Sequence, residues 1–127
     1  MLVRLLTAND VANLVAEVGL ERFVDELIAR LEDTFRRWRE LFTVPRVSFS
    51  YPEGVLEAMP AGDRRWYAVK VVNGHPGNPL RGLMTVVAVG VLAEAETGYP
   101  VMVADATLLT AFRTGVTSAV ATKYLAR

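Results

Sequence analysis

Three cationic side chains in apolar surroundings are the residues of this sequence best suited to bind an anion. Lys70 lies in the apolar run 69–72, and Arg113 lies in a largely apolar segment near the C-terminus. Arg46 directly follows Pro45 at the start of a predicted strand. A cation that faces the protein interior must meet an anion or lose its charge, and arginine offers a carboxylate two parallel donors. We therefore hypothesise that Arg46, Lys70 and Arg113 clamp one carboxylate; solvated strand faces for Lys70 and Arg46 are the alternative.

Most other catalytic signatures are missing from the sequence. Cysteine is absent, which excludes a disulfide framework, a thiolate zinc site and a cysteine nucleophile. His75 is the single histidine, so one chain cannot form a two-histidine metal site, and its place between glycine and proline is typical of a loop-packing residue. No P-loop, no G-x-G-x-x-G turn and no G-x-S-x-G elbow occurs.

The composition narrows the possible partners. Fourteen basic residues balance fourteen acidic ones, so no net positive field attracts nucleic acid or anionic lipid. The apolar content of 52% exceeds the usual ~45–50%, which suggests that a partner covers part of the surface. The longest uncharged apolar run, 83–93, is about half of the ~20 residues that a membrane-spanning helix needs. With no signal peptide in view, we expect a soluble cytoplasmic protein of one domain.

Helical patterns occur at both ends of the chain. Thr7 can cap a helix over 8–18 together with Asp10, and Gly19 can end it. A second helix follows, with an apolar stripe that recurs every three or four residues from 23 to 38. The last segment, 107–127, is helical by the same criterion. Asp105 or Thr107 can cap the start of this helix, and no stop signal follows its last periodic residue.

The middle of the chain alternates with a period of two, which predicts strands. The turn 51–54 joins the first two into a hairpin, whereas 74–79, with two prolines and two glycines, is expected to be neither helix nor strand. The run 83–93 is apolar throughout and is expected to be covered on both faces. These elements predict an α+β fold in which two N-terminal helices pack on a mostly antiparallel sheet of five to six strands, followed by a long C-terminal connecting helix. The predicted strands are 44–51, 55–59, 66–73, 83–93 and 101–104.

Four linked motifs resemble the ornithine cyclodeaminase/mu-crystallin family. They are KVVNGHPGN at 70–78, GLMTV at 82–86, GYP at 98–100 and LTAFRT at 109–114. Their order and spacing match over the whole chain, 1–127. Within the family, the segments FRRW at 35–38, VLEAMP at 55–60 and GVLA at 90–93 are most similar to bacterial ornithine cyclodeaminases.

The resemblance implies an activity and a role for several residues. Members of this family convert L-ornithine to L-proline and ammonia, with a hydride that moves to tightly held NAD and returns. By resemblance, Arg46, Lys70 and Arg113 bind the substrate carboxylate, and Thr85 and Arg113 contact the cofactor. Glu57 matches an acidic residue near the reacting carbon. The family also implies a homodimer that closes through the sheets, with the strand 83–93 as a candidate for its buried centre.

The chain departs from the family at its C-terminal end. In the family a Rossmann domain with a Gly-rich loop and a catalytic aspartate follows, and a later segment returns to complete the first domain. We therefore expect residues 1–127 to be a single substrate-binding and dimerisation domain, with 107–127 as the helix that leads into an absent NAD-binding domain. Alone, the chain is expected to be inactive and to bind no NAD stably.

Three alternatives stay open at this stage. The chain could be a non-enzymatic dimer that binds an amino acid or keto acid, or a purely structural dimerisation module. An intact parent enzyme could also have a sibling activity, such as alanine dehydrogenase or ketimine reductase.

Overall fold

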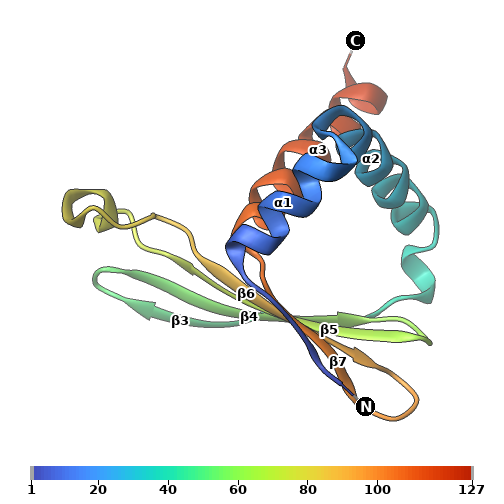
Figure 1. Cartoon of the computed structure of the whole chain (residues 1–127), viewed down its shortest axis with the longest axis horizontal. Helices are drawn as coiled ribbons and strands as arrows, with labels where there is room; N and C mark the ends of the chain where they lie inside the picture. Colours follow the sequence, from blue (N-terminus) through green and yellow to red (C-terminus); the bar gives the residue numbers. More distant parts are fainter. Residues whose placement is uncertain (1, 127) are drawn as a thin grey trace.

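A seven-stranded sheet carries three α-helices over one of its faces (Figure 1). The computed structural model describes residues 2–126. The α+β class predicted from the sequence is confirmed, with two additional short strands and two 3-10 helices. In chain order the elements are β1 (Arg4–Leu6), α1 (Ala8–Val18), α2 (Leu20–Arg36), η1 (Trp38–Glu40), β2 (Phe42–Thr43), β3 (Val47–Tyr51), β4 (Gly54–Gly62), β5 (Trp66–Gly74), η2 (Asn78–Arg81), β6 (Ala88–Glu94), β7 (Pro100–Asp105) and α3 (Thr107–Leu125).

The predicted start of the first helix is confirmed in detail. The Thr7 side chain accepts a hydrogen bond from the Asp10 N–H, and the Asp10 carboxylate accepts one from the Thr7 N–H. This reciprocal capping box satisfies two backbone donors that would otherwise have no partner in the first turn. Gly19 separates α1 from α2 with φ of 88°, a conformation that glycine adopts without steric cost.

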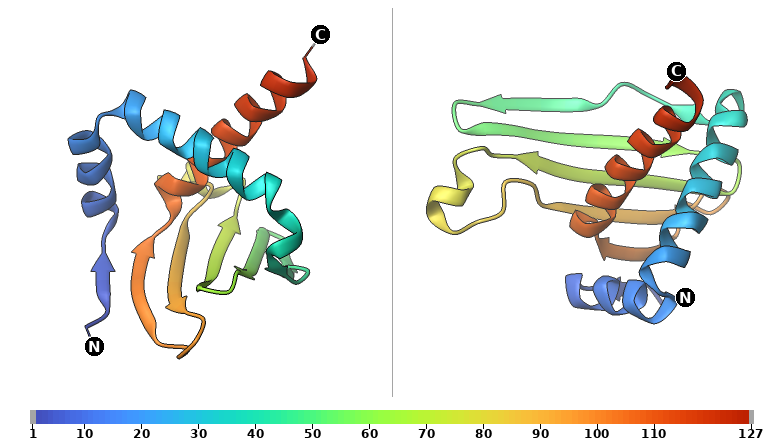
Figure 2. Two further views of the ribbon diagram at one scale, coloured as in Figure 1. Left: turned by 90° about the vertical axis from the view of Figure 1, so that its right-hand side faces the viewer. Right: turned by 90° about the horizontal axis from the view of Figure 1, so that it is seen from above.

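Helices α2 and α3 cross above the sheet and pack against each other (Figure 2). Phe23 of α2 and Phe112 of α3 meet edge to face, with ring centroids 5.1 Å apart. Further along, Lys123 donates to Glu32 over 2.7 Å. Helix α1 contacts β7 and β1, and α3 contacts β6, whereas α2 packs mainly on α3.

The sheet runs in the order β1-β7-β6-β5-β4-β2, with β3 paired to β4 beside β2. Every strand pair is antiparallel except β1 with β7. In this register Lys70 of β5 lies opposite Met59 of β4 and Gly90 of β6. Ser48 of β3 lies opposite Glu57 of β4. These two pairings determine which side chains gather beneath α3.

The core lies between the sheet and the helices and consists of small residues. Val72, Ala88 and Ala106 form a buried cluster against which Met59 packs. Val116 and Val120 of α3 are buried as well. The cluster of Val72, Ala88 and Ala106 therefore lies on the helix side of the sheet.

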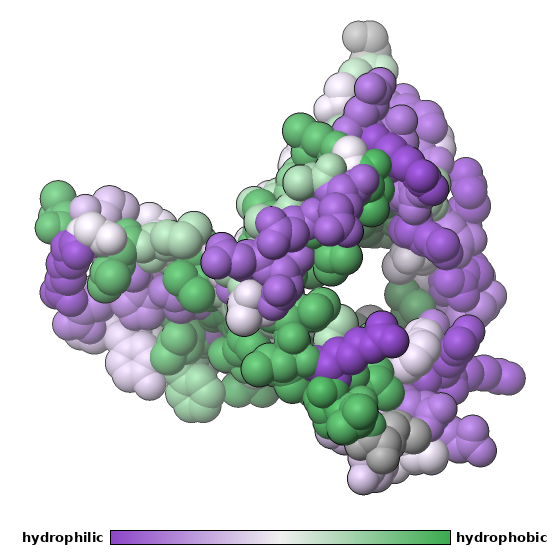
Figure 3. All heavy atoms as spheres, in the orientation of Figure 1, coloured by the Kyte–Doolittle hydropathy of each residue, from purple (hydrophilic) through white to green (hydrophobic). Residues whose placement is uncertain are grey.

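The opposite face of the sheet is apolar and open. Large side chains at alternate positions of five strands point away from the helices, and nine of them keep more than a third of their surface exposed. In Figure 3 hydrophobic residues gather along the sheet, whereas the outer side of α2 is hydrophilic. We call this surface the open sheet face; its large residues include Leu5, Val47, Phe49, Tyr51, Leu56, Tyr67, Val71, Val89 and Val91.

The structure corrects the prediction for the run 83–93. The strand begins only at Ala88, and 83–87 is irregular. The expectation that this strand is covered on both faces is also wrong within the described chain, since Val89 and Val91 are 43% and 38% exposed. Alternation between buried and exposed positions was hidden because the residues on both faces are apolar.

Three smaller predictions need correction as well. Residues 78–81 form the 3-10 helix η2, although 74–79 was expected to contain no helix. Strands β1 and β2 were missed because three and two residues are too few to show periodicity. Helix α3 ends at Leu125 and Ala126 is extended, so the helix does not continue to the chain end. Residues 1 and 127, which the predicted domain and helix included, lie outside the described residues.

Candidate functional site

Lys70 lies on the helix side of the sheet, which removes the alternative that it lies on a solvated strand face. Its neighbours in β5 alternate, so that Val71 belongs to the open sheet face and Lys70 points toward α3. The Lys70 ammonium donates to the Thr110 hydroxyl on α3 over 3.4 Å, a long hydrogen bond. The side chain is half-buried, and its hydrogen-bond partner is a neutral group.

The surroundings of Lys70 disfavour its charge. Desolvation lowers the pKa of Lys70 below its ordinary value of 10.5, and the positive charges of Arg113 and Arg46 lower it further. The Glu57 carboxylate acts in the opposite direction and is the weakest of these influences. Arg46 and Arg113 therefore both lie close enough to Lys70 to act on its charge. We call these three cations, together with Glu57, the cation cluster.

Arg46 and Glu57 form an ion pair at the edge of this cluster. Arg46 lies one residue before β3, and its Nη1 donates to Glu57 Oε2 over 3.0 Å. The second oxygen, Oε1, accepts a hydrogen bond from the Ser48 hydroxyl over 3.1 Å. The Glu57 side chain is 22% exposed and that of Arg46 is 55% exposed. Glu57 thus lies between a charged and a neutral donor, on the face of the sheet that carries Lys70.

The cluster contains more positive than negative charge. Among residues 2–126, neither Lys70 nor Arg113 forms an ion pair. Arg46 is neutralised by Glu57, whereas the half-buried Lys70 and the exposed Arg113 have no carboxylate partner among these residues. A bound carboxylate would restore the balance and would offset the cost of bringing these charges together.

Thr85 lies apart from this cluster, on the irregular segment 75–87 that projects beyond the sheet (Figure 1). Its carbonyl accepts a hydrogen bond from the His75 N–H over 2.9 Å. The Asn73 side chain donates to His75 Nδ1 and accepts from the Val87 N–H, so it ties the two ends of the segment together. In the part of the chain that is described, Thr85 makes no hydrogen bond with the four charged residues.

Sequence reasoning missed two polar side chains at the site, Ser48 and Thr110. Both were available from the sequence as hydroxyl residues near predicted charges, but nothing in the periodicity indicates which cation or carboxylate each one meets. Ser48 meets Glu57 across a strand pair, and Thr110 meets Lys70 from a helix 40 residues away in the chain.

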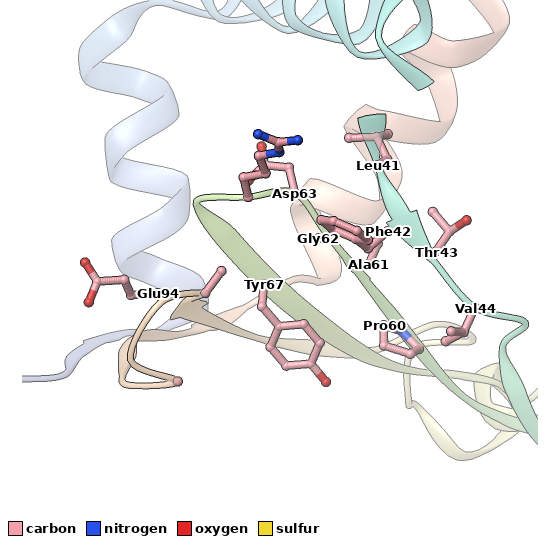
Figure 4. Close-up of a pocket in the computed structure, with 13 residues that line it drawn as sticks. Leu41, Phe42, Thr43, Val44, Pro60, Ala61, Gly62, Asp63, Tyr67 and Glu94 are labelled. Atoms are coloured by element: carbon pink, nitrogen blue, oxygen red, sulfur yellow. The ribbon is translucent and has the colours of Figure 1, made fainter. Parts of the chain in front are cut away.

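A large open pocket of about 930 Å³ lies elsewhere, at the end of the sheet where β2, β4 and the β6–β7 turn meet (Figure 4). Phe42, Val44, Pro60 and Tyr67 give it an apolar lining. Its acidic residue Asp63 accepts hydrogen bonds from two backbone N–H groups of its own turn, which lowers the pKa of this carboxyl. None of the predicted site residues lines this pocket, so we place the candidate site at the cation cluster.

The described residues do not fit a complete dinucleotide site. Such a site needs a glycine-rich turn between a strand and a helix, within a parallel β-α-β unit. Here β7 passes into α3 through Asp105 and Ala106, with no glycine, and β1–β7 is the one parallel pair among residues 2–126. The described residues therefore contain no pyrophosphate-binding turn of this kind.

Curated relatives are similar to this chain over nearly all of its residues, but they are about three times as long as the chain. The chain is 46% identical to the ornithine cyclodeaminase of Brucella abortus over 125 residues, which are 98% of this chain and 35% of that protein. It is 39% identical to the alanine dehydrogenase of Archaeoglobus fulgidus, covering 97% of this chain and 37% of that protein. The chain thus spans about a third of the length of the curated relatives that it matches.

Solved structures and a family model agree with this similarity. A lysine cyclodeaminase, solved for its recognition of L-lysine, L-ornithine and L-2,4-diaminobutyric acid, superimposes with a TM-score of 0.92 at 33% identity, covering all of this chain and 39% of that one. An archaeal alanine dehydrogenase dimer with bound NAD superimposes with a TM-score of 0.87 at 38% identity, covering 98% and 38%. Within residues 2–126 no helix is long and apolar enough to cross a membrane. Since the family model matches residues 8–127, the chain belongs to the ornithine cyclodeaminase/mu-crystallin family.

Proposed function

We propose that this chain is the substrate-binding and dimerisation part of an NAD-dependent ornithine cyclodeaminase, which forms L-proline and ammonia from L-ornithine. The observation that carries the proposal is the cation cluster beneath α3, where Lys70 and Arg113 have no carboxylate partner among the described residues. The similarity to ornithine cyclodeaminases supports the reaction, and the structure of lysine cyclodeaminase supports a diamino acid as the substrate.

Each residue of the cluster has a proposed task. Lys70 and Arg113 bind the substrate carboxylate, and Arg46 adds further donors while it is held by Glu57. Anchoring the carboxylate fixes the position of the substrate Cα, and orientation is the main contribution that the protein makes to hydride transfer. The negative charge of Glu57 lies within the same cluster, where it can attract an amino group of the substrate.

NAD would be held mainly by protein outside these residues, and it would accept and return the hydride. Within this chain we propose that Thr85 and Arg113 contact the cofactor, as the family resemblance implies. The archaeal alanine dehydrogenase with bound NAD supports a nicotinamide cofactor for the intact protein.

We further propose that the open sheet face binds a second copy of the chain. The nine large residues named above are apolar or aromatic, come from several strands, and are each 37–72% exposed. An apolar surface of this extent on one face of a sheet is typical of an interaction surface. The similar alanine dehydrogenase is described as a dimer, which supports a second copy as the occupant.

The binding proposal is tested by titrating L-ornithine into the 127-residue chain and recording heat and amide chemical shifts. We expect binding that Lys70→Met and Arg113→Met each weaken by about tenfold, since each removes a charged donor to a carboxylate. Arg30→Met, which removes a cation from α2, should bind as the wild type does. Circular dichroism melts establish that all variants are folded.

Three results would contradict the proposal or favour an alternative. Absence of ornithine binding, or equal loss in the Arg30 variant, would contradict the substrate site. Tighter binding of keto acids than of ornithine would favour a stand-alone keto-acid binder. Formation of proline by the isolated chain with NAD would overturn the expectation that it needs further protein for turnover.

A further inference from the structure

Ser48 contacts the cation cluster, and, like Thr110, it receives no role from the family resemblance or from the proposed reaction. We propose that Ser48 is a positioning residue that fixes the Glu57 carboxylate and, through it, the Arg46 guanidinium. This inference rests on the proposed function, because it concerns the same site. It adds a determinant of substrate affinity that does not itself touch the substrate.

The register of β3 and β4 creates the arrangement. Ser48 and Glu57 are directly opposite each other in this antiparallel pair, so their side chains emerge side by side on the helix side of the sheet. The Ser48 hydroxyl donates to Oε1 over 3.1 Å, and Arg46 donates to Oε2 over 3.0 Å. Each carboxylate oxygen is therefore held by a different residue, and rotation of the carboxylate breaks one of the two bonds.

The ion pair alone would hold this carboxylate weakly. Arg46 is 55% exposed, and exposed ion pairs gain little because two long side chains lose conformational freedom and solvent screens their charges. Serine has a single side-chain torsion to fix and therefore pays a smaller entropic cost. A short donor from the neighbouring strand is thus an efficient restraint on Glu57.

Fixing the Glu57 carboxylate also restricts the motion of the Arg46 guanidinium. The guanidinium has five N–H donors in a fixed plane, and the pair with Glu57 uses one nitrogen. With Glu57 fixed, one nitrogen of the guanidinium is anchored, which restricts the directions in which its other donors can meet a substrate carboxylate. Preorganisation of this kind raises affinity by lowering the entropy lost on binding.

Strand β3 offers a matched control. Ser50 lies two residues further along the same strand and on the same face, but it is opposite Val55. In the described structure, no side-chain hydrogen bond involves Ser50. Ser50→Ala removes the same atom as Ser48→Ala from a comparable exposed position without touching the carboxylate.

The experiment compares Ser48→Ala, Ser48→Thr and Ser50→Ala with the wild-type chain by two readouts. Nitrogen-15 NMR of the arginine side chains measures how fast the Arg46 guanidinium rotates, and calorimetry measures the affinity for L-ornithine. We expect Ser48→Ala to accelerate the rotation of Arg46 and to weaken ornithine binding by about threefold. Ser48→Thr should restore both, because it keeps the hydroxyl, and Ser50→Ala should change neither.

The two readouts separate this inference from the proposed function. Absence of ornithine binding in the wild type contradicts the proposed function, while the rotation of Arg46 still tests the role of Ser48. Unchanged rotation in Ser48→Ala, or equal acceleration in Ser50→Ala, would overturn the inference. A melting temperature that falls in Ser48→Ala without a change at Arg46 would show a merely structural role and would also overturn it.

Discussion

Arg46 Nη1 and Glu57 Oε2 are 3.0 Å apart, so two residues expected to act separately on a substrate neutralise each other. The family resemblance gives Arg46 to the substrate carboxylate and Glu57 to the vicinity of the reacting carbon. In the structure the negative charge of Glu57 would compete with a substrate carboxylate for the positive charge of Arg46, although the guanidinium donors that Glu57 does not use stay available. Under the proposed function, we expect this competition to favour a ligand that carries both a carboxylate and an amino group, because such a ligand can satisfy both partners of the pair.

The competition predicts that Glu57→Gln tightens the binding of a plain carboxylate. The neutral amide leaves Arg46 unpaired, and acetate affinity at low salt should rise by about threefold, the range expected from an exposed ion pair. Chemical shift titration with acetate measures the change. Glu53→Gln in the β3–β4 turn removes a nearby charge outside the cluster and should have no effect. Unchanged or weaker acetate binding in Glu57→Gln would contradict the competition.

The low pKa of Lys70 predicts that carboxylate binding depends on pH. Burial and the neighbouring arginines lower this pKa below 10.5, and a bound carboxylate favours the charged ammonium. Acetate stays an anion throughout, so its affinity should fall as the pH is raised toward 10.5 through the lowered folded-state pKa of Lys70. Lys70→Arg keeps its charge over this range and should give a flatter profile. Equal slopes in the two proteins would contradict the assignment to Lys70.

The lowered pKa of Lys70 also determines whether folding stability rises or falls with pH. Below the folded-state pKa, Lys70 is charged in both states and its burial costs stability. As the pH rises through that pKa toward 10.5, the folded protein loses the proton first and the cost is relieved. Relative to Lys70→Met, the wild type should therefore become more stable across this window in denaturant melts. A relative loss of stability would contradict the direction of the shift.

The ion pair between Glu32 and Lys123 predicts an acid-dependent contribution to stability. The hydrogen bond from Lys123 lowers the pKa of Glu32 below its ordinary value of 4.5, so the stabilisation is complete above 4.5 and is lost as the pH falls through the lower folded-state value. Glu32→Gln should lower the melting temperature by a few degrees at pH 7 and leave it unchanged near pH 2.

Glu26→Gln is the control for Glu32→Gln. Glu26 pairs with Arg22 one turn away on the same helix, and both side chains are largely exposed. Both residues of this pair belong to α2, so the pair does not connect two helices. Its loss should change the melting temperature little at either pH. Equal effects of the two substitutions at pH 7 would show that the bridge between α2 and α3 adds nothing of its own.

The open sheet face predicts a dimer that a single charge disrupts. Val71→Glu places a carboxylate in the middle of this face and should convert a dimer into a monomer in light scattering at micromolar concentration. Val18→Glu on α1 is the control, since Val18 and Val71 are 43% and 44% exposed. A monomeric wild type, or equal dissociation in both variants, would contradict the proposed interface.

Local sequence signals identified most of the elements. The capping box at Thr7, the glycine break at Gly19 and the turn 51–54 are all encoded within a few residues, and the structure confirms them. The predicted cap of α3 by Asp105 or Thr107 is wrong, because Ala106 is the N-cap, with no side-chain cap hydrogen bond. The other errors fell where local signals are weak: in the two short strands, in η2, and in the apolar run 83–93. In that run the side chains on both faces are hydrophobic, so the sequence shows no alternation from which the buried face could be recognised.

The sequence by itself determined the elements, the α+β class and the family, because these depend on short-range patterns and on linked motifs. Only the tertiary structure decided the partners within the site. The pairs Arg46–Glu57, Ser48–Glu57 and Lys70–Thr110 join residues 9 to 40 positions apart. Such contacts depend on strand register and on where α3 crosses the sheet, and a shift of one residue in register would turn each strand side chain to the opposite face.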